Sequence, residues 1–249
     1  MPNTSSMVQP PEITRPGIHL GTHPYDLLRP GRVDYSQALI MQQQRVETLI
    51  AHGGPNLLIL LEHPPVYTVG RSGKAEEMID TDFPKRNNIQ VLDTDRGGRT
   101  TYHGPGQVVA YVIRDLRPNT GRVLDHVRRL EETVIGTLSC FGIQGTREQA
   151  NPGVWVDGEK IAALGVRIRR GITYHGFALN HRCDLNHFSG IVPCGLQGRR
   201  VTSLAHLGVE VSAATLEGCL LATFAKVFDA HLTVIPSTHL SPHHQGMCA

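Results

Sequence analysis

The chain has 249 residues, of which 40% are hydrophobic and 18% charged, and its formal net charge is +2. These values are typical of a globular protein with a sizeable core, and so small a net charge gives no argument for nucleic-acid binding. No apolar run approaches the ~18 residues of a membrane span, and the polar, proline-rich start lacks the apolar segment of a secretory signal. Five cysteines in a chain of this length do not indicate a disulfide framework, so we expect free thiols and a cytoplasmic protein.

The distribution of apolar residues along the chain predicts one domain with two tails. Residues 1–30, rich in proline, are predicted to be a weakly ordered arm, residues 31–235 a single domain, and residues 236–249 a flexible tail. Helical spacing of apolar residues predicts helices over 34–52, 121–141 and 212–231. Apolar or β-branched runs predict strands over 57–62, 67–70, 89–94, 107–116, 153–157, 160–169 and 172–181. Because strands and helices do not alternate regularly, the order indicates an α+β fold with a mixed, largely antiparallel sheet flanked by helices.

Residues 95–107 form a glycine-rich segment that carries polar groups. Arg96, Arg99 and His103 supply hydrogen-bond donors, and the glycines allow the backbone to approach a ligand closely. A plain surface turn between strands is the simpler interpretation of the glycine and proline content. The concentration of arginine, threonine, tyrosine and histidine favours a binding loop.

Lys160 begins a predicted strand that follows an Asp-Gly turn. In an extended strand alternate residues share a face, so Lys160 is expected in one apolar row with Ala162, Leu164 and Val166. An amine at that place can take part in proton transfer. It can equally extend to water at the strand end, and the residues alone leave both interpretations open.

Cys194 lies in a tight Pro-Cys-Gly segment, where a thiol is more available than in a helix. Cys140 and Cys219 fall in amphipathic helices and are expected to pack as small apolar residues. A thiolate stabilised by a nearby cation is a nucleophile, although a single cysteine in a loop is more often structural.

The histidines and the cysteine over residues 175–187 raise the alternative of a zinc site. Their spacing fits none of the usual ligand patterns, so no metal site is expected there. The segment from Gly70 to Ala75 also fails the phosphate-loop pattern, which requires glycine at 68 and serine or threonine at 75.

Taken together, these segments resemble the lipoyl(octanoyl) transferase family, the octanoyl-acyl-carrier-protein:protein N-octanoyltransferases. The matching segments are EHPPVYTVGR at 62–71, RGGRTTYHGPGQ at 96–107, GVW at 153–155, KIAALGV at 160–166, HGFALN at 175–180, and PCG at 193–195 with TSL at 202–204. Each segment is modest alone, but their order across residues 30–230 makes the match specific.

The resemblance implies the fold of the biotin and lipoate protein ligase catalytic domain, and it implies roles for individual residues. Cys194 matches the nucleophile that carries the acyl group as a thioester, and Lys160 matches the partner that favours its thiolate and moves protons. No metal and no cofactor are implied. The residues that match acyl-substrate contacts are Arg96, Gly97, Gly98, Arg99, Thr100, Thr101, Tyr102, His103, Ala163, Leu164, Gly165, Gly176, Phe177 and Ala178.

The reaction implied by the resemblance moves an octanoyl group from octanoyl-acyl carrier protein to a lysine of a lipoyl domain. The implied acceptors are the lipoyl domains of 2-oxoacid dehydrogenase complexes and the glycine cleavage H protein, with no nucleic-acid or membrane partner. An ATP-dependent lipoate or biotin ligase on the same fold is the main alternative. A non-enzymatic module that binds the carrier or lipoyl domain, and a zinc hydrolase, are the others.

Overall fold

The computed structural model describes residues 21–117, 123–148, 151–192 and 199–237. A seven-stranded sheet has the order β10-β1-β2-β6-β9-β8-β7. Its strands are β1 (His23–Arg32), β2 (Asn56–Glu62), β6 (Gln107–Asp115), β7 (Gly153–Val156), β8 (Glu159–Arg169), β9 (Ile172–Asn180) and β10 (Ala230–Val234). Strand β1 pairs parallel with β2 and β10, and the four remaining pairs are antiparallel. The predicted mixed, largely antiparallel sheet is therefore confirmed.

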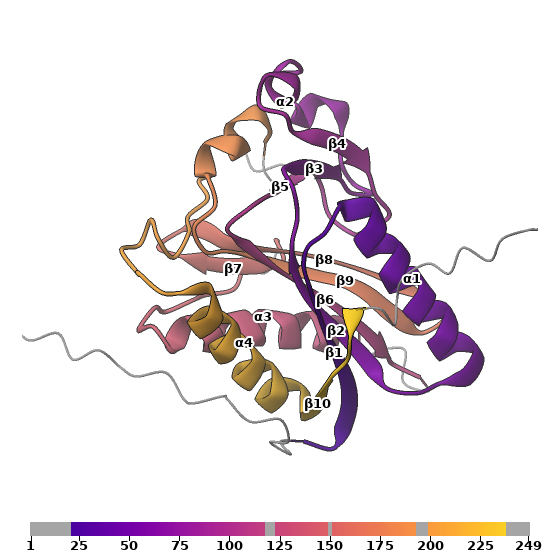
Figure 1. Ribbon diagram of the computed structural model, residues 1–249. Helices are drawn as coiled ribbons and strands as arrows, with labels where there is room; N and C mark the ends of the chain where they lie inside the picture. Colours follow the sequence, from indigo (N-terminus) through magenta and orange to yellow (C-terminus); the bar gives the residue numbers. More distant parts are fainter. Residues whose placement is uncertain (1–20, 118–122, 149–150, 193–198, 238–249) are drawn as a thin grey trace, which may run out of the picture.

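A second, three-stranded sheet lies at one end of the large one (Figure 1) and has the order β4-β3-β5. Its strands are β3 (Val66–Val69), β4 (Gln90–Asp93) and β5 (Thr101–His103). Three short helices pack around it: η1 (Ala75–Glu77), α2 (Phe83–Arg86) and η3 (Leu185–Gly190). Tyr67, Tyr102 and Phe188 form a small apolar cluster of their own between these elements.

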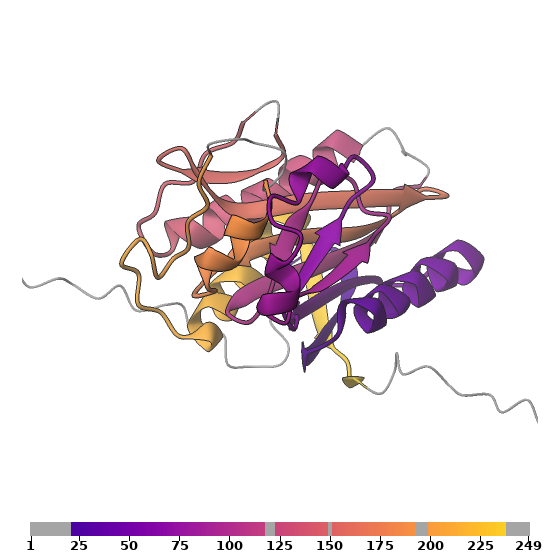
Figure 2. The ribbon, with the colours of Figure 1, turned by 90° about the horizontal axis from the view of Figure 1, so that it is seen from above.

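Long helices cover both faces of the large sheet (Figures 1 and 2). Helices α3 (Val123–Ser139) and α4 (Ala213–Phe228) lie on one face and α1 (Tyr35–His52) on the other. Alternation along β2 divides its residues accordingly: Leu58 packs with the α3–α4 core, and Leu57 and Ile59 pack with the α1 core. No helix of the described residues is long and apolar enough to cross a bilayer.

The expected disordered arm over residues 1–30 is wrong from His23 onward, because β1 lies inside the sheet between β10 and β2. Tyr25, Leu27 and Leu28 are buried there. Proline normally argues against an inner strand because it lacks an N–H donor. Here the register shift that follows Leu28 takes Pro30 out of the ladder. Residues 1–20, and residues 238–249 of the expected tail, lie outside the described residues.

The third predicted helix ends earlier than expected, at Phe228. Asp229 adopts a left-handed conformation with φ 49°, which reverses the chain into β10. Strand β10, which replaces the end of the predicted helix, and strand β5, inside the glycine-rich segment, were not predicted. Both strands are short, and each pairs with a strand that is distant in sequence.

Candidate active site

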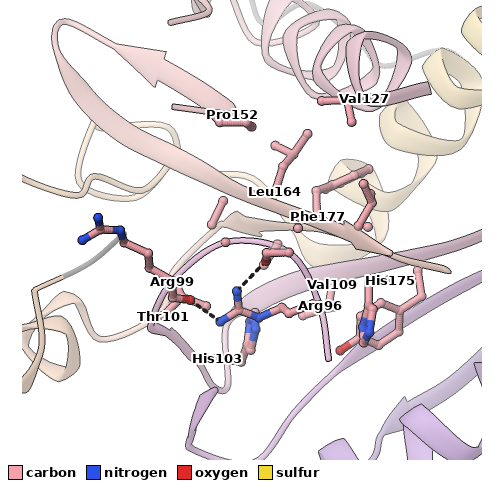
Figure 3. A pocket seen from close by; sticks show the side chains of 18 of the residues that line it. Arg96, Arg99, Thr101, His103, Val109, Val127, Pro152, Leu164, His175 and Phe177 are labelled. Carbon is pink, nitrogen blue, oxygen red and sulfur yellow. Dashed lines mark hydrogen bonds between the residues drawn. The ribbon is translucent and has the colours of Figure 1, made fainter. Parts of the chain in front are cut away.

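A cavity of about 470 Å³ lies where the glycine-rich segment meets β8 and β9. Its size is within the range of small-molecule sites. The predicted substrate contacts that line it are Arg96, Gly97, Gly98, Arg99, Thr101, His103, Ala163, Leu164, Gly165, Gly176, Phe177 and Ala178. Residues that lay far apart in the sequence are thus brought together around one space (Figure 3).

Thr100 and Tyr102 are the two predicted contacts that do not line the cavity. The amide of Thr100 donates to the buried carboxylate of Glu77 at 2.9 Å. The hydroxyl of Tyr102 lies 2.7 Å from His187 Nδ1, inside the cluster around the small sheet. Alternation along β5 explains the difference, because Thr101 and His103 share the face opposite to Tyr102.

The wall formed by β8 and β9 carries small residues on one face and large ones on the other. Leu164 and Phe177 pack with the α3–α4 core, whereas Ala178 belongs to the opposite core. Figure 3 shows Leu164 and Phe177 on the side of Val127 and Pro152, across the strands from Arg96 and His103. The space beside the glycine-rich segment is therefore walled by Ala163 and Ala178, which leave room for a ligand.

Glycine is required where the glycine-rich segment touches β8. The amide of Gly97 donates to the Val166 carbonyl at 3.1 Å. A Cβ on Gly97 would lie 2.9 Å from that carbonyl oxygen, and a Cβ on Gly165 would lie 2.7 Å from the Gly97 oxygen. Both distances are shorter than a carbon–oxygen contact permits, so any larger residue would push the two backbones apart.

Arg96 holds the glycine-rich segment in shape. Its guanidinium donates to the Thr68 carbonyl at 2.6 Å, to the Thr68 hydroxyl at 2.8 Å and to the Arg99 carbonyl at 2.7 Å. The side chain is buried although it lines the cavity. Arg99 is half-exposed and pairs with Glu77 at 3.1 Å. The two arginines are thus anchored before any ligand binds.

His103 and His175 are buried histidines that face the cavity. Burial lowers the pKa of His103 to about 3, and His103 Nδ1 lies 2.7 Å from Gln107 Oε1. Burial also lowers the pKa of His175, whose Nε2 lies 2.8 Å from Asp95 Oδ1. The hydrogen bond from His175 lowers the pKa of Asp95 to about 2, so a neutral imidazole faces a carboxylate.

His175 has an unusual backbone, with φ 61°, a conformation that costs a non-glycine residue energy. Its amide donates to Oε1 of the buried Gln42 on α1 at 2.8 Å. Helix α1 therefore fixes the direction of this side chain, a role that the sequence did not suggest for Gln42.

Three further polar residues at the cavity escaped sequence reasoning: Tyr35 at the start of α1, Tyr111 on β6, and His63 behind them. The Val33 carbonyl lies 2.6 Å from His63 Nδ1, so that nitrogen carries the proton, and Tyr111 donates to Nε2 at 2.7 Å. The aromatic rings of His63, Tyr35 and His103 are packed together. His63 lies in the segment EHPPVY, Tyr111 in the predicted strand over 107–116 and Tyr35 in the first predicted helix, but only their tertiary contacts reveal the cluster.

Lys160 lies on a different face of β8 from the one predicted. Val154 pairs with Ala162 and Trp155 with Lys160, so Ile161 is an extra residue that forms a β-bulge. The bulge reverses the alternation, and Lys160 shares its face with Ala163 and not with Ala162. The position of the amine agrees, because it would be 3.2 Å from a Cβ on Gly153, the partner of Ala163.

The amine of Lys160 is held beside the cavity. It donates to Asn151 Oδ1 at 3.0 Å and to the Pro152 carbonyl at 3.3 Å, and both of these residues line the cavity. It also lies 4.8 Å from the ring centroid of Trp155, a cation–π contact. The side chain is buried, so it does not extend to water as the alternative interpretation required.

Cys194 lies outside the described residues. The described chain before it ends at Val192, whose amide donates to the Glu77 carbonyl at 2.7 Å. After it, Val201 forms a parallel bridge with Lys160, and the Lys160 amide donates to the Arg200 carbonyl at 3.0 Å. The segment that follows Cys194 is thus attached to the backbone of Lys160.

The chain matches a known protein family and relatives over most of its length. The Lipoyl protein ligase A/B catalytic domain family matches residues 34–225. An octanoyltransferase of Bradyrhizobium sp. (strain ORS 278) is 45% identical over 216 residues, which is 83% of this chain and 88% of the relative. An octanoyltransferase of Magnetococcus marinus is 46% identical over 196 residues, covering 79% of this chain and 90% of the relative.

Solved structures share the fold at low identity. A bipartite lipoate protein ligase from Thermoplasma acidophilum, studied with its E2 lipoyl domain, has a TM-score of 0.69 at 20% identity and covers 86% of this chain and 88% of its own. A lipoate-protein ligase A bound with ATP also has a TM-score of 0.69 at 20% identity, covering 86% of this chain and 90% of its own. The predicted fold of the lipoate ligase catalytic domain is therefore confirmed.

Proposed function

Because the chain belongs to the lipoyl(octanoyl) transferase family within the lipoyl protein ligase A/B catalytic domains, we propose that it moves an octanoyl group from octanoyl-acyl carrier protein to a lipoyl-domain lysine. The transfer passes through a thioester on Cys194. Lys160 is the proton-transfer partner, and the cavity holds the acyl chain. The observation that carries the proposal is the bulge at Ile161, which turns Lys160 toward the face of Ala163 and so toward the cavity.

The first half-reaction forms the acyl-enzyme. The ammonium of Lys160 beside Cys194 favours the thiolate, which attacks the carbonyl of the donor thioester. The C–S bond to the carrier breaks, and the departing carrier thiolate takes a proton from the Lys160 ammonium, which leaves Lys160 as the neutral amine. Backbone N–H groups of the glycine-rich segment or next to Cys194 can stabilise the oxyanion, an effect worth ~3–4 kcal/mol for a well-placed donor.

In the second half-reaction the ε-amine of the lipoyl-domain lysine attacks the Cys194 thioester. The neutral amine of Lys160 accepts the proton of that amine, and the products are an amide and the Cys194 thiolate beside the restored Lys160 ammonium. Conversion of a thioester to an amide runs downhill, so no nucleotide is consumed. The methylenes of the octanoyl chain contribute ~0.8 kcal/mol each when they are buried, and the small residues Ala163 and Ala178 give them space.

The carrier and lipoyl domains are generally acidic, and basic residues lie beside the Lys160 segment. Arg200 is 84% exposed, and its nearest carboxylate, Glu159, is 3.9 Å away. Arg199 is 44% exposed and lies over the Trp155 ring at 5.0 Å. We assign these arginines to docking of the protein substrates, for which KM must rise with salt. A KM that salt does not change would contradict this assignment.

The test weighs the intact protein after incubation with octanoyl-acyl carrier protein and no ATP. A gain of one octanoyl group that hydroxylamine removes is expected for wild type and for the control Cys183→Ser, but not for Cys194→Ala. Addition of lipoyl domain must then discharge the acyl-enzyme. Absence of the gain, or an equal gain in Cys194→Ala, would reject the transferase. A requirement for ATP would favour the ligase alternative, whose fold this chain shares.

A further inference from the structure

A continuous line of hydrogen bonds runs from the cavity to the backbone of Lys160. His103 Nδ1 lies 2.7 Å from Gln107 Oε1, Gln107 Nε2 lies 2.8 Å from Asn180 Oδ1, and Asn180 Nδ2 lies 2.8 Å from the Thr202 carbonyl. The Thr202 amide then donates to the Lys160 carbonyl at 3.0 Å. All five residues are buried. Neither Gln107 nor Asn180 touches the cavity, and the proposed reaction gives neither of them a role.

The far end of this line determines the direction of every bond in it. The Thr202 carbonyl can only accept, so Asn180 must present its nitrogen there and its oxygen to Gln107. Gln107 must then present its nitrogen to Asn180 and its oxygen to His103. The Tyr102 carbonyl, 3.3 Å from Gln107 Nε2, requires the same orientation of that amide. Since the Gln107 oxygen also only accepts, the proton of His103 lies on Nδ1.

We propose that Gln107 and Asn180 are positioning residues that hold His103 as a hydrogen-bond acceptor in the cavity. The Nε2 atom of His103 then carries a lone pair, which accepts a hydrogen bond from the ε-amine of the lipoyl-domain lysine. It cannot donate to a carbonyl or an oxyanion. The identity of the ligand rests on the proposed octanoyl transfer, whereas the position of the proton on His103 does not.

The opposite tautomer would reverse the whole line. A proton on His103 Nε2 would make Nδ1 an acceptor, and Gln107 would have to turn its nitrogen toward it. The Gln107 oxygen would then face the Tyr102 carbonyl, and Asn180 would face the Thr202 carbonyl with its oxygen. In each of these reversed contacts, a buried side-chain oxygen would face a backbone carbonyl oxygen with no proton between them. Burying polar atoms without a hydrogen-bond partner costs free energy.

The tautomer is measured directly by NMR of protein labelled with ¹⁵N in histidine. The His103 signals are identified by their absence from the spectrum of His103→Gln. We expect a protonated Nδ1 and an unprotonated Nε2, unchanged between pH 7 and pH 5, because burial keeps this imidazole neutral. A proton on Nε2, an average over both tautomers, or a doubly protonated ring at pH 5 would overturn the proposal.

Two substitutions of Gln107 separate its positioning role from its contribution to stability. Gln107→Glu keeps an acceptor for His103 and must retain the proton on Nδ1, but it loses the donor to Asn180 Oδ1 and to the Tyr102 carbonyl, so its thermal stability must fall. Gln107→Met offers only a weakly accepting thioether, so His103 must populate both tautomers, and KM for the lipoyl domain must rise about threefold to tenfold, the value of one hydrogen bond. Gln43→Met, at an exposed position on α1, is the matched control and must leave both measurements unchanged.

The outcomes remain separable from those of the proposed reaction. If Gln107→Met keeps both the wild-type tautomer and the wild-type KM, the positioning role is wrong even though transfer occurs. If wild type shows no transfer but has the expected tautomer, the proposed reaction is wrong and the assignment of His103 stands. Thermal unfolding of each variant confirms that the NMR and kinetic comparisons are made on folded protein.

Discussion

The amine of Lys160 donates to Asn151 Oδ1 at 3.0 Å, and Asn151 also lines the cavity. Asn151 therefore both borders the cavity and orients the amine of Lys160. Two features produce this relationship. The bulge in β8 turns Lys160, and residues 151–152 lie immediately before β7, the strand that pairs with β8.

Replacing Asn151 by alanine tests whether it orients Lys160. Loss of one hydrogen bond of about 1–1.5 kcal/mol predicts a fall of about fivefold to tenfold in octanoyl transfer, with little change in the free energy of unfolding. Steady-state rates with lipoyl domain as acceptor measure the effect. Asn186→Ala, at an exposed position, is the control. A transfer rate equal to that of wild type would show that the Asn151 side chain does not matter.

Gly165→Ala tests the contact between the glycine-rich segment and β8. The new methyl would lie 2.7 Å from the Gly97 oxygen, so the segment must move away from the strand, and we expect KM for the octanoyl donor to rise more than tenfold. Gly136→Ala is matched in strain, because its methyl would lie 2.5 Å from Thr223 Cγ2 between α3 and α4. Both variants should lose about 1–3 kcal/mol of stability. Equal donor KM values in the two would refute a local effect at the cavity.

Stability is expected to fall on acidification below pH 6.5. Burial lowers the pKa of His63 to about 4 and those of His103 and His126 to about 3 from the ordinary 6.5. The unfolded chain binds protons below pH 6.5 while the folded chain does not, so the histidine contribution to the free energy of unfolding is fully present above pH 6.5 and is lost progressively from pH 6.5 to about 4 for His63 and to about 3 for His103 and His126. Each histidine contributes up to about 1.4 kcal/mol per pH unit in that window. Asp95, with its pKa near 2, adds its own loss only below about pH 4. Urea unfolding at several pH values measures the slope, and a flat profile from pH 7 to 4.5 would contradict it.

His126 offers a single-residue version of that experiment. It is fully buried on α3 against Phe228, and neither ring nitrogen has a hydrogen-bond partner among the described residues. His126→Leu removes these unpaired polar atoms from the core, so stability at pH 7 should rise by about 1–2 kcal/mol. The slope of the free energy of unfolding against pH, measured between pH 6.5 and 4, should also decrease by the contribution of one histidine. Destabilisation together with an unchanged pH slope would indicate that the ring has a partner.

The thiols should differ sharply in reactivity. Burial raises the pKa of Cys183 to about 12 and that of Cys219 to about 11, so both remain protonated at pH 8 and should resist alkylation in the folded protein. Peptide mapping after treatment with iodoacetamide, with and without urea, measures this protection. Prior incubation with octanoyl-acyl carrier protein should protect Cys194 alone. Rapid labelling of Cys183 in the native protein would contradict the buried environment.

Local sequence patterns were sufficient to predict the helices and strands whose apolar residues follow a regular spacing. Helix α1, helix α3 and the β8–β9 hairpin follow their predicted ranges closely, because amphipathic spacing and turn residues are visible in the sequence. Strands β1 and β10 were missed because they depend on each other: β1 contains Pro24 and Pro30, and β10 immediately follows a helix. No pattern within either segment shows that the other will lie beside it.

The same distinction applies to the site. The glycine-rich segment and the small residues of β8 and β9 line one cavity, and their role as substrate contacts stays a prediction. The predicted face of Lys160 was wrong, because side chains alternate strictly only in a strand without a bulge. Nothing in the local sequence identifies Ile161 as the extra residue. Asp95, Gln42 and Tyr111 act on the cavity through contacts between distant elements, and their own neighbours in the sequence did not indicate this.

The parallel pairing of β1 with β10 has a consequence for synthesis of the protein. His23 to Leu27 lie beside Ala230 to Val234, so one edge of β1 stays unpaired until residues 230–234 have emerged from the ribosome. An unpaired edge rich in apolar residues is a site for wrong strand association. Nascent chains stalled before Ala230 should therefore bind chaperones that chains stalled well beyond the end of β10 no longer bind.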